Sequence, residues 1–95
     1  MTQKPQRIDF SHKFEKQLKK APLEIKIAFR NRFNLFLQNQ LNPLLNNHAL
    51  TGELKDFRSI NITGDWRAIY SQYSYPVEGL IIVFEILGTH SQLYK

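Results

Sequence analysis

The chain has 95 residues, too few for a cofactor-binding unit beside a folded core, so we expect a single domain over residues 1–95. Its net charge of +5, from 13 Lys and Arg against eight Asp and Glu, favours polyanionic partners or an acidic protein partner. Cysteine is absent, which excludes disulfides and thiolate metal sites, and no apolar run suits a signal peptide or membrane span; we expect a cytoplasmic protein without membrane contact.

The first forty residues predict a short strand and two helices. Residues Arg7–Phe10 read as the strand, and Ser11 is a suitable N-cap for a first helix that ends at Ala21-Pro22. Proline suits the start of a helix, so a second helix is expected to follow at once and to run to about Gln40. Its apolar stripe consists of Ile25, Phe29, Phe33 and Phe36. These two helices predict a helical hairpin.

The remainder of the chain predicts strands. A connecting loop from Leu44 to Gly52 precedes them, and the strands are expected at Glu53–Ile62, Asp65–Tyr73 and Leu80–Leu87, with a tight turn at Thr63-Gly64 and a longer one from Ser74 to Gly79. The last strand is apolar at nearly every position, which is typical of a strand covered on both faces. We therefore expect an α+β fold in which the hairpin packs on a small twisted, mainly antiparallel sheet of three to four strands.

Two strand ends carry side chains able to do chemistry. Asp65, Trp66 and Arg67 supply an acid, an indole and a guanidinium, while His90 and Tyr94 follow the last strand. In a small basic protein this combination suits RNA cleavage.

The order of several segments resembles a known family. After the helix pair come Leu50-Thr51-Gly52-Glu53-Leu54, Phe57-Arg58, Gly64-Asp65-Trp66-Arg67-Ala68-Ile69-Tyr70 and Gly88-Thr89-His90. Over nearly its whole length the chain is similar to the RelE/ParE superfamily of bacterial toxins, and closest to the YafQ-like branch. The resemblance implies a ribosome-dependent mRNA endonuclease that acts at the A site of the small subunit and is held inactive by a cognate antitoxin. It implies neither a metal nor a small-molecule cofactor.

The resemblance also assigns site residues. The positions that match active-site residues of YafQ-like toxins are His48, Asp65, Trp66, His90 and Tyr94. Two positions depart from that pattern, because Asn61 stands where those toxins have a histidine and Leu87 where they have an arginine. Arg67 instead matches an active-site arginine of RelE-like members, so the chain combines features of two site designs.

Attack of a 2′-hydroxyl on the adjacent phosphate needs a base, a cation and an acid. A histidine can serve as acid or base because its pKa lies near neutrality. We expect His90 to be the general acid and Arg67 to hold the phosphate oxygens with its fork of donors. The general base is His48 or Asp65, and the residue types do not choose between them.

Each candidate also has a purely structural interpretation. His90 and Asp65 can serve a turn, and His48 can be a solvated loop residue. Trp66 suits a packing anchor as well as a platform for a base. Arg67 and Arg58 can be strand-surface charges, and Tyr94 can pin the end of the chain, although all three also suit RNA contacts; His12 receives no role.

A basic helical surface is expected from the lysines of the first helix. Lys13, Lys16 and Lys20 are the candidate RNA contacts, joined by Lys19, Lys26, Arg30 and Arg32. The alternative is an ordinary solvated helix face.

Two other function classes remain open on the sequence. One is a non-catalytic ParE-like toxin that binds DNA gyrase, which does not require His48 and His90. The other is a passive binding module for RNA or protein, which predicts no growth arrest.

Overall fold

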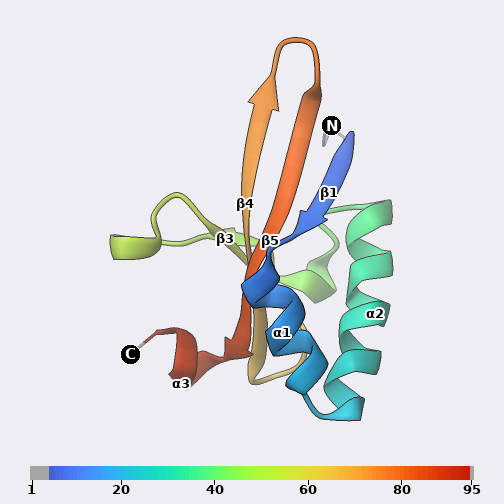
Figure 1. Ribbon diagram of the computed structural model, residues 1–95, viewed down its shortest axis with the longest axis vertical. Helices are drawn as coiled ribbons and strands as arrows, with labels where there is room; N and C mark the ends of the chain where they lie inside the picture. Colours follow the sequence, from blue (N-terminus) through green and yellow to red (C-terminus); the bar gives the residue numbers. More distant parts are fainter. Residues whose placement is uncertain (1–4, 95) are drawn as a thin grey trace.

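The computed structural model describes residues 5–94, in which a mixed sheet is partnered by three α-helices. The elements in chain order are β1 (Arg7–Phe10), α1 (His12–Lys20), α2 (Leu23–Gln38), β2 (His48–Ala49), β3 (Arg58–Asn61), β4 (Trp66–Tyr75), β5 (Gly79–Thr89) and α3 (His90–Leu93). Two short 3₁₀ helices, Pro43–Leu45 and Gly52–Leu54, interrupt the connection around β2. The α+β class is therefore confirmed (Figure 1).

The sheet has five strands in the order β1-β5-β4-β3-β2, so the expected three to four strands were too few. The parallel pairing of β1 with β5 makes the sheet mixed, while the other neighbours are antiparallel. Strand β5 lies between β1 and β4, which confirms that its apolar sequence belongs to an inner strand. The additional strand, β2, spans two residues inside the segment predicted as a loop.

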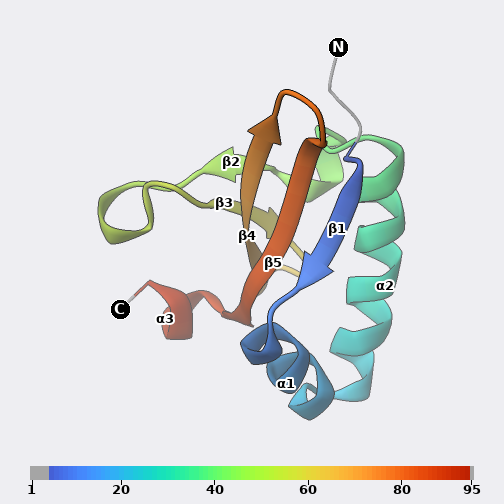
Figure 2. The ribbon, with the colours of Figure 1, turned by 45° about the horizontal axis from the view of Figure 1, so that its top comes forward.

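Other element boundaries also differ from the prediction. The strand expected from Glu53 to Ile62 is limited to β3, because Gly52–Leu54 forms a 3₁₀ helix instead. Helix α2 ends at Gln38 rather than near Gln40. The expected helical hairpin is not confirmed: α1 packs mainly against β5, whereas α2 runs along the side of the sheet (Figure 2).

The core lies between α1, α2 and one face of the sheet, which we call the helix-side face. Its centre is the ring of Phe84 on β5, which lies 5.4–5.9 Å from six other aromatic rings. Those rings belong to Phe10, Phe14, Phe29, Phe33, Phe36 and Tyr70. The predicted stripe of α2 therefore supplies much of the core, although Phe33 is only half-buried.

A β-bulge divides β5 into two parts. Tyr70 on β4 pairs with Phe84, but the preceding residue, Ile69, pairs with Ile86, so Glu85 is the extra residue. The bulge is anchored by Ser11, the N-cap of α1, whose hydroxyl accepts from the Phe14 N–H at 3.0 Å and donates to the Glu85 carbonyl at 2.9 Å. The bulge consequently turns Leu87 toward the core and Ile86 toward the other face.

Within the described residues, no helix has the length and apolar character needed to cross a membrane.

Candidate active site

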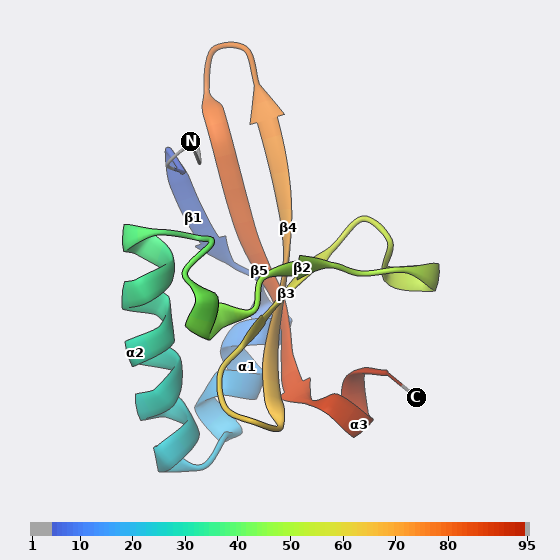
Figure 3. The same cartoon turned by 180° about the vertical axis from the view of Figure 1, so that it is seen from behind.

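The face of the sheet opposite α1 and α2 carries the candidate site. Side chains alternate along a strand, and Ile60, Ala68 and Tyr70 belong to the core on the helix-side face. Their neighbours therefore point the other way, and we call the face that they form the distal face. Its members on β3 and β4 are Ser59, Asn61, Arg67 and Ile69. Figure 3 shows α2 and α3 on opposite sides of the sheet, so α3 lies on the distal side.

Helix α3 brings His90 and Tyr94 to the distal face. It begins with a capping box between Thr89 and Gln92, so His90 is the first helical residue and is exposed. The His90 and Tyr94 rings lie 4.7 Å apart between centroids, with a tilt of 59°. The Tyr94 hydroxyl donates to Ser59 Oγ at 3.2 Å, which ties this aromatic pair to β3.

The backbone of His90 is fixed by the β3–β4 turn. Its N–H donates to the Asp65 carbonyl at 2.9 Å. This bond uses the main chain of both residues and leaves their side chains out, so the exposed Asp65 carboxylate and the His90 ring are both accessible at the same end of the sheet.

His48 reaches the distal face from β2. It pairs with Ser59 of β3, the residue that accepts the Tyr94 hydrogen bond. Its ring Nδ1 lies 2.8 Å from the Asn46 carbonyl oxygen, which can only accept. Nδ1 must therefore carry the proton, and in the neutral ring Nε2 is left with a free lone pair. This tautomer suits a general base.

Arg67 is held at the β3–β4 turn by backbone carbonyls. Its Nη1 donates to the carbonyls of Thr63 and Gly64, both at 3.0 Å, and of Trp66 at 3.3 Å. Among residues 5–94, no protein partner is found for Nε or Nη2, so that edge of the guanidinium is free to bind an anion. Asn61, which pairs with Arg67, has a buried Oδ1 without a hydrogen-bond partner in the described part of the chain.

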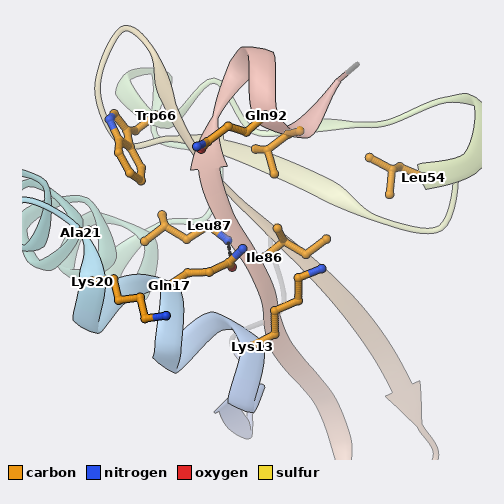
Figure 4. Close-up of a pocket in the computed structure, with 10 residues that line it drawn as sticks. Lys13, Gln17, Lys20, Ala21, Leu54, Trp66, Ile86, Leu87 and Gln92 are labelled. Carbon is orange, nitrogen blue, oxygen red and sulfur yellow. Dashed lines mark hydrogen bonds between the residues drawn. The ribbon is translucent and has the colours of Figure 1, made fainter.

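A groove of about 640 Å³ lies between α1 and α3 (Figure 4). Lys13, Gln17 and Lys20 line it from α1, and Trp66 forms part of its wall. Lys16 is exposed elsewhere on α1 and does not line the groove. The other lining residues are Ala21, Leu54, Ile86, Leu87, Gln92 and Leu93. Two of the three candidate lysines and the indole are thus brought together.

Three positions of interest lie apart from the distal face. Trp66 alternates with Arg67 and packs, partly buried, against the core on the helix-side face. Arg58 pairs with Tyr70 on the helix-side face, where its Nε donates to Asn47 Oδ1 at 2.9 Å. Leu87, which stands where an arginine was expected, is 2% exposed and belongs to the core. Its place on the distal face is taken by the apolar Ile86.

Ser59 is a further candidate site residue, which the sequence reasoning missed. It is fully buried, pairs with His48 and accepts from Tyr94, so it links the two histidine-bearing segments. The only signal was a polar residue inside a strand beside the apolar Ile60, which is too common to identify a site. Among residues 5–94, no cluster of three or more His, Cys, Asp or Glu side chains has metal-binding geometry.

Comparison with known proteins identifies one family. Residues 6–95 match the family model described as the bacterial toxin of type II toxin-antitoxin systems, YafQ. A comparison with curated protein sequences found no significant match.

Solved toxin structures share the fold. YafQ from E. coli strain BL21(DE3) has a TM-score of 0.75 and 24% identity, covering 93% of this chain and 97% of YafQ. The toxin in the E. coli DinJ-YafQ toxin-antitoxin complex has a TM-score of 0.73 and 26% identity, covering 95% and 99% of the two chains. A metal-bound toxin from Helicobacter pylori has a TM-score of 0.64 and 30% identity, covering 93% and 98%.

Proposed function

Because the chain belongs to the YafQ family of bacterial toxins from type II toxin-antitoxin systems, we propose that it is an endoribonuclease. Its substrate is messenger RNA on the small ribosomal subunit, at the A site, and its action in the cytoplasm inhibits translation. A cognate antitoxin holds it inactive, by analogy with the complex of E. coli YafQ with DinJ.

The observation that carries this proposal is the convergence of two histidines on one face of the sheet. His48 and His90 come from β2 and α3, which are far apart in the sequence, and both are connected to Ser59, through strand pairing and through Tyr94 respectively. Neither ring is buried, so both can reach a substrate. Two histidines on a common surface can act as base and acid in one reaction.

The proposed reaction is attack of the 2′-hydroxyl on the adjacent phosphate. His48 Nε2 takes the proton of the hydroxyl, which its Nδ1–H tautomer favours, and the exposed Asp65 carboxylate is the alternative base. The oxygen then bonds to phosphorus while the bond from phosphorus to the 5′-oxygen breaks. His90 gives a proton to that leaving oxygen. The products are a 2′,3′-cyclic phosphate and a free 5′-hydroxyl.

Arg67 stabilises the charge on the phosphorane. Its Nη1 is held by three carbonyls of the turn, so the guanidinium is oriented before the substrate arrives. Nε and Nη2 remain as two adjacent donors, the arrangement that matches two phosphate oxygens.

The groove between α1 and α3 is the proposed path of the RNA next to the cleaved bond. Lys13 and Lys20 supply positive charge for phosphates, and Trp66 supplies an aromatic surface for a base. The same helix that carries the proposed acid, His90, lines the groove with Gln92 and Leu93, which supports this path.

We expect Lys13→Ala to weaken binding to mRNA-programmed ribosomes more than Lys16→Ala, because Lys13 lines the groove and Lys16 does not. The two residues are both exposed lysines of α1 and form a matched pair. The slope of log affinity against log salt should fall by about 0.7 for a lost contact to single-stranded RNA. Fluorescence titrations at several KCl concentrations and fixed magnesium measure this slope. Equal slopes for the two variants would contradict the groove as the RNA path.

The function itself is tested by inducing the chain in a bacterial host without its antitoxin and mapping the 5′ ends of messages. We expect growth arrest with new mRNA ends in phase with the reading frame, relieved by co-expressing the antitoxin. Growth arrest with intact messages and altered DNA supercoiling would indicate a toxin that binds gyrase instead. Normal growth would indicate a passive binding module.

A further inference from the structure

We infer that Asn47 is a positioning residue, which holds His48 in place from the opposite side of the sheet. This inference rests on the proposed role of His48 as a base. It concerns a side chain that lies on the helix-side face, away from the RNA, and therefore acts through the backbone of the segment before β2.

Asn47 has an unusually complete set of hydrogen bonds for a half-buried loop residue. Its Oδ1 accepts from Arg58 Nε at 2.9 Å, and its Nδ2 donates to the Tyr70 hydroxyl at 2.7 Å and to the Gln40 carbonyl at 3.1 Å. An asparagine side chain can make about four hydrogen bonds, and three are made here. The loop is thus attached to the segment that follows α2, to β3 and to β4 through a single amide.

The anchor on β4 is deeply buried. Tyr70 is fully buried, and its ring lies 5.2 Å from Phe36 and 5.5 Å from Phe84. Burial raises the pKa of the Tyr70 hydroxyl above its ordinary value of 10.0, although the hydrogen bond with Asn47 and the nearby Arg58 partly offset this rise. The hydroxyl therefore remains neutral and stays available to Asn47 at any physiological pH.

Strand alternation explains how a contact on one face controls the other. Arg58 and Ser59 are successive residues of β3 that point to opposite faces. Asn47 meets Arg58 on the helix side, and His48 pairs with Ser59. Asn47 and His48 are therefore both held by β3, the first on the helix-side face and the second on the distal face.

His48 needs such an anchor because its own strand is short. Strand β2 has two residues, and a pair of this length contributes few hydrogen bonds. The residue before Asn47 has an unfavourable backbone conformation. Asn46 has φ 46° and ψ 48°, a left-handed conformation that a non-glycine residue rarely adopts. That conformation belongs to the residue whose carbonyl accepts from His48 Nδ1. Fixing Asn47 thus helps to fix the tautomer of His48.

The test uses Tyr70→Phe, which removes one partner of Asn47 and keeps the buried ring. We expect kcat for cleavage of mRNA on programmed ribosomes to fall roughly 10- to 100-fold while KM stays unchanged, since a poorly placed base slows chemistry without weakening binding. Asn47→Asp, which still accepts from Arg58, should lose less than Asn47→Ala. Ser71→Ala is the matched control, because it removes a hydroxyl of β4 that bonds Glu85 on the other face, at 2.9 Å. It should leave kcat unchanged.

Two further measurements separate positioning from a general structural effect. In a His48→Ala background, Tyr70→Phe should cause no additional loss of kcat, whereas an equal loss in both backgrounds would overturn the inference. The nitrogen chemical shifts of the His48 ring should report a proton on Nδ1 in the wild type and a mixture of tautomers in Tyr70→Phe. Unchanged shifts would also overturn it. The NMR measurement does not need cleavage, so it decides the inference even if the wild type proves inactive on RNA and the proposed function fails.

Discussion

Replacing His90 by alanine is expected to lower the rate of mRNA cleavage by about 10²–10⁴-fold, the usual contribution of a general acid. The reason is that the exposed imidazole of His90, beside Tyr94, is the group that protonates the leaving oxygen in the proposed reaction. The free energy of unfolding should change little, since the ring is exposed and the hydrogen bond to Asp65 uses the His90 main chain. Single-turnover cleavage on programmed ribosomes and urea denaturation measure the two quantities.

His12→Ala is the matched control for His90→Ala. His12 is also exposed and also begins a helix, but it lies on α1 and has no proposed role. It should leave both the cleavage rate and the stability close to those of the wild type. If His90→Ala retained wild-type cleavage, the assignment of the acid would be wrong; if it lost stability instead, its role would be structural.

Replacing Phe84 by alanine is expected to destabilise the fold by about 3–5 kcal/mol, the usual cost of removing a buried aromatic ring. Phe84 is fully buried at the centre of six other rings on α1, α2 and the neighbouring strands, so no single neighbour can fill the space left behind. Small domains have about 5–15 kcal/mol of stability, so such a loss removes a large share of it. Urea denaturation measures the change.

Two further variants provide reference values for the loss of stability in Phe84→Ala. Phe84→Leu keeps much of the buried volume and should cost clearly less than the alanine variant. Tyr73→Ala removes a ring from β4 where 45% of the residue is exposed, and it should cost less than about 1 kcal/mol. A loss for Phe84→Ala no larger than that of Tyr73→Ala would contradict the central place of Phe84 in the core.

The long and strongly patterned elements could be predicted from the sequence. Strand β1, helix α1 with its N-cap Ser11, and the inner position of β5 are confirmed. Strand β2 could not be predicted, because two residues carry no periodicity and its pairing depends on β3. The helical hairpin is not confirmed, and the packing of α1 on β5 could not be predicted, because it is a tertiary preference that periodicity does not contain.

The residue types of the candidate site could be proposed from the sequence, but the faces on which they lie could not. Arg58 and Arg67 both appeared as strand-surface cations, and only the pairing of β3 with β4 separates them onto opposite faces. Leu87 appeared equivalent to a site position because the bulge at Glu85 is invisible in the sequence. The roles proposed for His48, Asp65 and His90 remain predictions that the experiments above address.

Because of the bulge at Glu85, positions along β5 differ in how well they tolerate an insertion or a deletion. Inserting one residue between Ile86 and Leu87 would move Leu87 out of the core and onto the distal face, whereas deleting Glu85 would leave both residues on their present faces, because the pairing with β4 already skips it. The exposed turn from Pro76 to Glu78 lies between β4 and β5, outside the paired residues. Changes in its length therefore leave every later residue on its present face of the sheet. Variation in length among related chains should therefore collect at the hairpin tip and avoid the stretch that leads into α3.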